Sequence, residues 1–115
     1  MYLYVLKNYI TSYITMLNTN KAAEGFNAVG SKHRLSVLLE LVKLGSKGLT
    51  IGEIQDLLNI PLSTLAHHLD YLKKANLIKQ EKKGRSILNF AQLDHIQSLA
   101  DYLLKECCVN ESKRK

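Results

Sequence analysis

The sequence predicts a mostly helical domain that carries one small β-hairpin. Its 115 residues, of which 46% are hydrophobic, suit a single domain with its own core. Only one proline and six glycines interrupt the chain, and leucines recur at helical spacing along most of it. The helical period is lost in "LIKQEKKGRSILNF", residues 77–90, where two short β-like runs flank a turn that contains glycine.

Residues 1–19 are expected to form an apolar helical extension of this domain. In "MYLYVLKNYITSYITML" one helical stripe holds Leu3, Leu6, Ile10, Tyr13 and Leu17. The segment lacks the basic start and the cleavage site of a signal peptide, and it is too short to span a bilayer. We therefore expect no membrane partner. Translation from Met16 is an alternative, in which the preceding residues are not part of the protein.

The main folded domain is expected over residues 20–108 and begins with two helices. Residues 18–30 read as a short helix, with Asn20 as its cap and Gly30 at its end. Residues 31–45 form a stronger helix, which Ser31 caps and Gly45 ends. Its inward face is expected to hold Leu35, Leu38, Leu39 and Val42.

A second pair of helices follows, joined by the short turn "NIP". Thr50 caps the first of them, and Glu53 stands three residues on, as in a capping box. Its apolar face consists of Ile51, Ile54, Leu57 and Leu58. The second helix covers residues 62–75. Two helices joined by a short turn and followed by a hairpin with a basic tip form the winged helix–turn–helix arrangement.

The last helix is expected in "AQLDHIQSLADYLLKECC", residues 91–108. One apolar stripe holds Leu93, Ile96, Leu99, Ala100, Leu103 and Cys107. A chain of this size has little core in which to bury this stripe and the N-terminal one together. We therefore expect the two stripes to pair across a two-fold axis in a homodimer. Residues 109–115 are expected to form a basic, flexible tail.

The charge of the chain indicates a polyanionic partner. The net charge is +6 and the pI about 9.4. The terminal "ESKRK" contributes +2, three bases minus one acid, so the remaining +4 belongs to the rest of the chain. Cys107 and Cys108 are neighbours, with Cα atoms about 3.8 Å apart, which is too close for an unstrained disulfide. Two free thiols point to a reducing, cytoplasmic location.

The adjacent histidines of helix 62–75 are expected to have different roles. At 100° per residue, Leu65, Leu69 and Leu72 face inward with Leu62 nearby, and His68 lies about 60° from their centre, at the margin of the core. His67 points outward, where the helix could meet base edges. The candidate DNA contacts of this helix are Ser63, Thr64, Ala66, His67, Asp70 and Lys74.

Other roles for these residues are weaker. Adjacent helical side chains diverge by about 100°, so His67 and His68 cannot readily share a metal ion. No nucleophile–base grouping or Gly-rich phosphate loop is present, so an enzyme is not expected. A plain solvated face around His67 remains open. At the hairpin tip Lys82, Lys83 and Arg85 surround Gly84, where they could contact phosphates or simply form a solvated turn.

From about Ala22 to Cys108 the sequence resembles the ArsR/SmtB family of small bacterial repressors. "VGSKHRLSVLLELV" is similar to the family's opening helix, and "KKGRSILNF" is similar to its wing. "LTIGEIQDLLNIPLSTLAHHLDYLKKANLI" is similar to its helix–turn–helix, in which a Ser-Thr pair precedes a His-Leu. The resemblance implies a homodimer that represses transcription and leaves DNA when an effector binds.

Several positions depart from the pattern of that family. Leu62 stands where members often carry glutamine, and Ala66 replaces a serine. The positions of a metal-binding "CxC" are Thr50 and Gly52, and the Asp-x-His pair of the last helix is broken, because His95 follows Asp94 directly. Both metal sites are therefore expected to be absent.

What remains is "LLKECC", which resembles a subgroup whose vicinal cysteines bind trivalent arsenic, here without the usual third cysteine. Soft thiolates suit such a thiophilic atom. The resemblance thus makes Cys107 and Cys108 a candidate As(III) site. The alternative is a buried cysteine at the dimer interface beside an incidental neighbour. No other cofactor is expected.

The sequence as a whole predicts a homodimeric winged-helix repressor that binds double-stranded DNA at an inverted-repeat operator. Derepression by a thiol-binding metalloid is a further expectation. Two alternatives stay open. One is a module of the same fold that binds proteins without reading DNA, and the other is an ArsR-like regulator that senses no metal.

Overall fold

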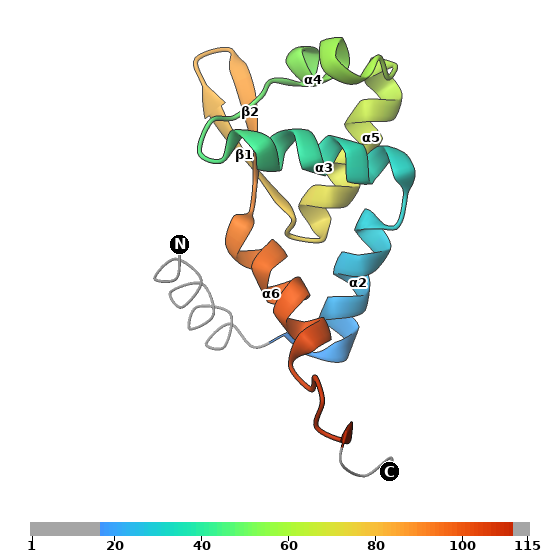
Figure 1. The fold of residues 1–115 in the computed structure, drawn as a ribbon. Helices are drawn as coiled ribbons and strands as arrows, with labels where there is room; N and C mark the ends of the chain where they lie inside the picture. Colours follow the sequence, from blue (N-terminus) through green and yellow to red (C-terminus); the bar gives the residue numbers. More distant parts are fainter. Residues whose placement is uncertain (1–16, 112–115) are drawn as a thin grey trace.

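The computed structural model describes residues 17–111. These residues form five helices and one hairpin, in the order α2 (Thr19–Val29), α3 (Lys32–Leu44), α4 (Ile51–Leu58), α5 (Leu62–Lys74), β1 (Ile78–Lys83), β2 (Ser86–Ala91) and α6 (Leu93–Leu104). The hairpin and α4 lie at one end of the molecule, and α2 and α6 lie at the other (Figure 1). The predicted winged helix–turn–helix is confirmed. The expected extension over residues 1–19 and the tail over 109–115 lie mostly outside the described residues.

Side-chain caps define where three of the helices begin. The side chain of Ser31 accepts a hydrogen bond from the backbone of α3, and Thr50 and Glu53 form the predicted capping box of α4. The expected cap of α2 was wrong by two residues. Asn18 caps this helix, and Asn20 lies inside its first turn. Both are asparagines with one residue between them, so local sequence did not distinguish them.

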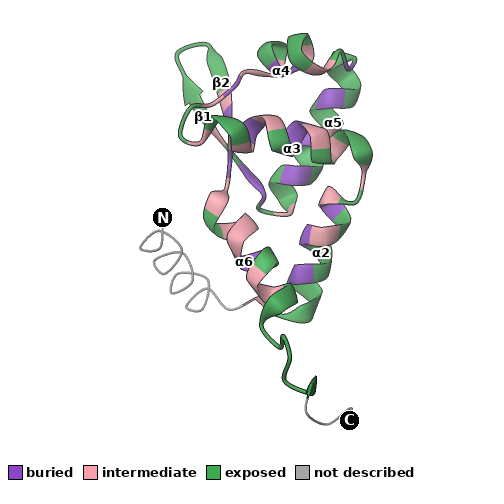
Figure 2. Ribbon diagram, viewed as in Figure 1, coloured by how far each residue is buried: buried purple, intermediate pink, exposed green. Residues whose placement is uncertain are grey.

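The core lies where α3 crosses α5 and reaches the base of the hairpin (Figure 2). Its fully buried members include Leu65 and Leu72 of α5, as the helical spacing predicted. On α3 the prediction was partly wrong. Leu35 and Leu39 are 41% and 47% exposed, and the buried residues are Val37, Leu38 and Leu41. On α4, Ile54 is buried but Leu57 is exposed.

The hairpin is anchored to the segment between α3 and α4. Asn89 pairs with Leu49 through two backbone hydrogen bonds, which form an isolated antiparallel β-bridge beside the two-stranded hairpin. The side chain of Asn89 is buried, donates to the carbonyl of Leu49 at 3.0 Å and accepts from Gln80 at 2.8 Å. A buried amide satisfied in this way makes the position of the hairpin specific. Its loop is two residues long, and Gly84 adopts φ +60°, which favours glycine.

Two glycines near this anchor should respond oppositely to alanine. A Cβ on Gly48 would lie 2.8 Å from the Phe90 ring and 3.0 Å from the carbonyl oxygen of Asn89. Gly48→Ala should therefore lower the free energy of unfolding by about 1–3 kcal/mol through overpacking. Gly52 lies exposed in α4, where a Cβ would make only an ordinary contact of 3.9 Å with the Thr50 hydroxyl oxygen, and Gly52→Ala should raise stability by roughly 0.5–1 kcal/mol. Urea denaturation of both variants checks this, and equal effects would contradict it.

The last helix is shorter than predicted. It ends at Leu104, so Cys107 and Cys108 lie in the turns that follow it and are exposed. Leu93, Ile96 and Leu99 pack on or in the core, whereas Leu103 is 68% exposed. From Lys105 to Glu111 every described side chain is exposed, so tertiary packing does not support further helical turns.

Within residues 17–111 no helix is long and apolar enough to cross a membrane.

Candidate nucleic-acid interface

The turn between α4 and α5 sets the direction of the candidate recognition helix, α5. Asn59 ends α4 in the left-handed conformation, with φ 55° and ψ 43°, and its N–H donates to the carbonyl of Gln55. The side chain of Gln55 in turn donates to the carbonyl of Ile60 at 3.2 Å. Pro61 then leads into α5 with φ −55°, and no side chain caps the start of that helix. The first backbone N–H groups of α5 are thus available to an anion.

The outer face of α5 carries all six residues that the sequence predicted as DNA contacts on this helix. The structure leaves each of them exposed: Ser63, Thr64, Ala66, His67, Asp70 and Lys74. Leu62 is also exposed, at 47%, and does not join the buried leucines as expected. Small and polar side chains therefore cover the first turns of α5, which permits close approach of a large partner.

Two of these residues form an ion pair. Nζ of Lys74 lies 2.9 Å from a carboxylate oxygen of Asp70, and both side chains are more than half exposed. The hydrogen bond from Lys74 lowers the pKa of Asp70. The charge of Lys74 is therefore already shared with a carboxylate, so this lysine is a weaker candidate for a phosphate contact than an unpaired one.

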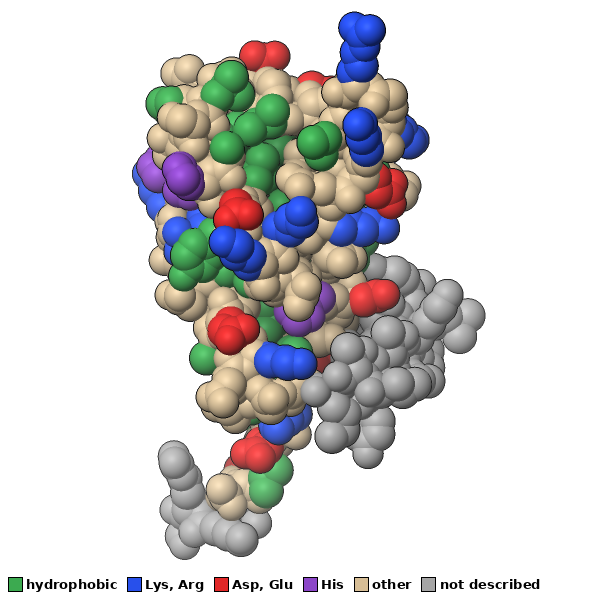
Figure 3. Space-filling model, turned by 180° about the vertical axis from the view of Figure 1, so that it is seen from behind, with side chains coloured by type: hydrophobic (Ala, Val, Ile, Leu, Met, Phe, Trp, Pro, Cys, Tyr) green, Lys and Arg blue, Asp and Glu red, His purple; other side chains and the backbone are tan. Residues whose placement is uncertain are grey.

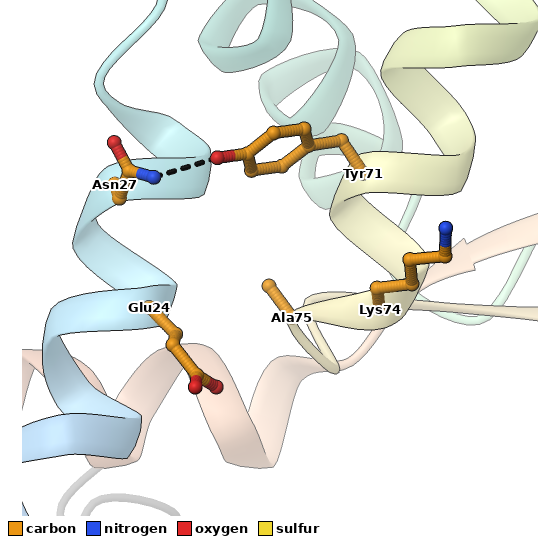
Figure 4. Close-up of a pocket in the computed structure, with 5 residues that line it drawn as sticks. All are labelled: Glu24, Asn27, Tyr71, Lys74 and Ala75. Atoms are coloured by element: carbon orange, nitrogen blue, oxygen red, sulfur yellow. Dashed lines mark hydrogen bonds between the residues drawn. The ribbon is translucent and has the colours of Figure 1, made fainter.

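A polar network at the edge of this outer face holds α5 against α2 and α3. The guanidinium of Arg34 donates to the carbonyls of Ala28 and Asn27 at 2.6 and 3.2 Å, at the end of α2. It also lies 4.1 Å from the centre of the Tyr71 ring. The Tyr71 hydroxyl accepts a hydrogen bond from Asn27 at 2.6 Å (Figure 4). The sequence did not predict this role of Arg34, because its partners come from separate helices.

A cleft of about 180 Å³ opens beside this network, between α2 and the end of α5. Figure 4 shows its lining residues, Glu24 and Asn27 on α2, Tyr71 and Lys74 on α5, and Ala75. The sequence did not predict this cleft, since no single stretch of residues indicates a space formed between two helices.

The structure separates the two adjacent histidines as predicted. His67 is exposed, whereas His68 is half-buried and stacks on His33 of α3 with ring centres 6.0 Å apart. Nε2 of His68 is buried without a hydrogen-bond partner. Burial, together with the nearby charge of Arg34, lowers the pKa of His68. His68 therefore braces α5 against α3 in its neutral form.

This arrangement predicts a loss of stability in acid. The pKa of His68 in the folded chain lies below its ordinary value of 6.5, so the unfolded chain binds more protons as the pH falls. The free energy of unfolding should therefore decrease once the pH drops below about 6.5. Burial lowers the pKa of His95 as well, so both residues contribute.

Urea midpoints measured on either side of this pH should differ less in His68→Gln than in the parent. His67→Gln, on the exposed side, should keep most of the difference. An unchanged pH dependence in His68→Gln would contradict the assignment.

The hairpin, whose first strand packs against α5, carries basic side chains at its tip. Lys82, Lys83 and Arg85 are all exposed around its tip, and no salt bridge among the described residues involves them. Figure 3 shows basic side chains spread over one face of the molecule, with hydrophobic side chains gathered in its upper part. The unpaired charges of the hairpin are the better candidates for phosphate contacts.

The cysteine pair lies at the opposite end of the molecule from the hairpin (Figure 1). The Sγ atoms of Cys107 and Cys108 are 3.0 Å apart, and Cys108 has φ 65°. The hydrogen bond with Cys107 raises the pKa of Cys108. The described residues contain no cluster of three metal-binding side chains, so a ligand bound here would have two protein sulfurs from this segment. Both thiols are exposed in the single chain, and burial of Cys107 at a dimer interface stays a prediction.

Comparison with known proteins places the chain among transcriptional regulators. A family model described as a helix-turn-helix domain matches residues 29–81. An uncharacterized HTH-type transcriptional regulator of Methanocaldococcus jannaschii is 44% identical over 64 residues, which are 56% of this chain and 70% of that protein. The transcriptional repressor SdpR of Bacillus subtilis is 30% identical over 79 residues, which are 69% of this chain and 84% of SdpR.

Solved structures show the same fold. An ArsR-like transcriptional regulator from a Rhodococcus species superposes with a TM-score of 0.69 at 23% identity, covering 83% of this chain and 86% of that one. The predicted resemblance to this group of regulators is thus confirmed, and the matched relatives are named as regulators rather than enzymes. From its helix–turn–helix sequence and its fold, the chain belongs to the helix–turn–helix transcriptional regulators with an ArsR-like winged-helix structure.

Proposed function

We propose that the protein is a repressor that binds double-stranded DNA sequence-specifically, as a homodimer on an inverted repeat. The observation that supports this most is the outer face of α5. Small and polar side chains cover it. The basic side chains of Lys82, Lys83 and Arg85, which form no salt bridge among the described residues, lie at the tip of the hairpin. Such a helix can enter the major groove while the hairpin contacts the backbone. Repression, rather than activation, is proposed because the relative SdpR is named a repressor.

The homodimer is proposed from the end of α6. Leu103 and Leu104 are 68% and 66% exposed, although they belong to a helix whose preceding residues pack on the core. Neighbouring exposed leucines at one end of a small domain suit pairing with a second copy across a two-fold axis. Such a dimer would place its two α5 helices in successive major grooves, with half-sites about 10 base pairs apart.

An effector site at Cys107 and Cys108 is the finer part of the proposal. The two exposed sulfurs lie close enough to bind one thiophilic atom such as As(III) without unwinding of α6, because that helix already ends at Leu104. The third position on the atom would go to solvent or to a thiol of the partner subunit. A ligand at the end of α6 would lie next to the proposed dimer contact. It would therefore change the spacing of the two α5 helices if it prefers one dimer geometry.

One pair of measurements tests the central proposal. The protein is mixed with a pool of random duplexes, and the bound fraction is sequenced and then re-measured at two salt concentrations. We expect an enriched inverted repeat whose binding weakens steeply with salt. Mass measurement at micromolar concentration should give about twice 13.0 kDa. Absence of any enriched sequence would instead favour a module that binds proteins, and a monomer at that concentration would contradict the dimer.

A further inference from the structure

We propose that Leu62 reads the 5-methyl group of thymine, so that the protein recognises a thymine by apolar contact at the start of α5. This inference rests on the proposed function, because it assumes that α5 enters the major groove. It adds to that proposal a specific base and the residue that selects it. The observation that points to it is a leucine exposed to water at a position where a polar side chain would be better solvated.

Leu62 is more exposed to solvent than the other leucines of its helix. It is 47% exposed, whereas the three other leucines of α5 are nearly or fully buried. It also does not belong to the partly buried side chains that pack against the core. About half of its surface therefore stays in water in the folded chain, and contact with an apolar group of a ligand would remove that surface from water.

The place of Leu62 in α5 brings it to the DNA if the helix enters the groove. It is the first residue of α5, directly after Pro61, and the first turn of a recognition helix is the part that contacts base edges. Ala66, four residues on, is also exposed and lies on the same edge of the helix. The two form an apolar strip beside the polar strip of Ser63 and His67.

This apolar strip matches one feature of the major groove. Of the groups that bases present there, the thymine methyl alone is apolar, and aliphatic side chains recognise it by contact. Residues four apart on a helix are separated by about 6 Å along its axis, which is less than two base-pair steps of roughly 3.4 Å. One half-site can thus present a methyl to Leu62 with a neighbouring base pair beside Ala66.

Replacement of thymine by deoxyuridine tests the contact, because it removes the methyl and leaves every hydrogen-bonding group in place. The probe is the duplex that the protein itself selects from a random pool, with each thymine of the half-site changed in turn. At one position the parent should lose about fourfold in affinity, the equivalent of one buried CH2 group per methyl. Leu62→Ala should bind the thymine and deoxyuridine duplexes equally. Leu39→Ala on α3 is the matched control, since Leu39 has the same 47% exposure, and it should keep the parent's preference.

The outcomes separate this inference from the proposed function. If no duplex is selected, the proposed DNA binding fails, and the inference fails with it. If a duplex is bound but no thymine position is sensitive to loss of its methyl, the inference alone is overturned. The same holds if Leu62→Ala retains the parent's fourfold preference, because another residue then contacts the methyl. Thermal melting of Leu62→Ala and of a second variant, Leu62→Gln, verifies that both remain folded, and Leu62→Gln should also lose the preference.

Discussion

Replacement of Lys83 and Arg85 by alanine should remove much of the salt dependence of DNA binding while leaving sequence preference intact. Both side chains are exposed at the hairpin tip, and neither takes part in a salt bridge among the described residues. Each cation that binds a phosphate releases condensed counterions. Removal of both cations from both subunits should therefore lower the slope of log affinity against log salt by roughly four units. Between about 50 and 200 mM salt, the parent should weaken roughly a hundredfold more than the variant.

A control that removes the same charge elsewhere distinguishes contact from general attraction. Lys21→Ala with Lys43→Ala also lowers the net charge by two, but at exposed positions on α2 and α3. We expect this variant to keep most of the parent's salt slope. If the slope falls equally in both double variants, the hairpin makes no specific backbone contact and only net charge matters.

Changes on α5 should act on sequence preference instead. Ser63→Ala and His67→Ala should each reduce the discrimination between the selected duplex and random DNA, by about 1–3 kcal/mol for a good base contact. Their effect on the salt slope should be small, since neither contacts a phosphate in this arrangement. Loss of affinity that is equal for every sequence would show that His67 does not read bases.

The other large effect expected is release of the selected duplex by As(III). Cys107 and Cys108 present two sulfurs 3.0 Å apart on an exposed turn, so one arsenic atom can bind both. Cys107→Ser and Cys108→Ser should each abolish release, because a single remaining thiol cannot chelate. Without arsenic both variants should bind DNA as the parent does. Val109→Ser changes an exposed neighbour in the same segment and should still respond.

The pH dependence of arsenic binding gives a second measurement. The pKa of Cys108 is raised by its hydrogen bond with Cys107, so this thiol keeps its proton to higher pH than an ordinary cysteine. Each thiol proton leaves with a hydroxide of As(OH)3 as water, so binding to two protonated thiols releases no net proton and the affinity should stay level as the pH rises. Once the thiols ionise, binding takes up protons and the affinity should fall, and the raised pKa of Cys108 moves this fall to higher pH. If saturating arsenic leaves the parent on DNA, or if both serine variants still respond, these thiols are not the sensor.

Features that depend on neighbours along the chain could be predicted from the amino-acid sequence. The capping box at Thr50 and Glu53 and the inward leucines of α5 follow from local hydrogen bonds and helical period, and the structure contains both. The outward position of His67 and the hairpin with Gly84 in its turn also follow from the local sequence. These features sufficed to predict the fold and the exposed face of the candidate interface.

Where the local pattern is compatible with two arrangements, packing between distant segments selects one of them. On α3 apolar residues occupy more than one face, so only packing against α5 and the hairpin selected Val37, Leu38 and Leu41 over Leu35 and Leu39. The contacts of Arg34 and Asn89 join segments distant in sequence, which no period reveals. The end of α6 is the clearest example. Cys107 continues its stripe in sequence, but a helix persists only where burial supports it, and the described residues beyond Leu104 are all exposed.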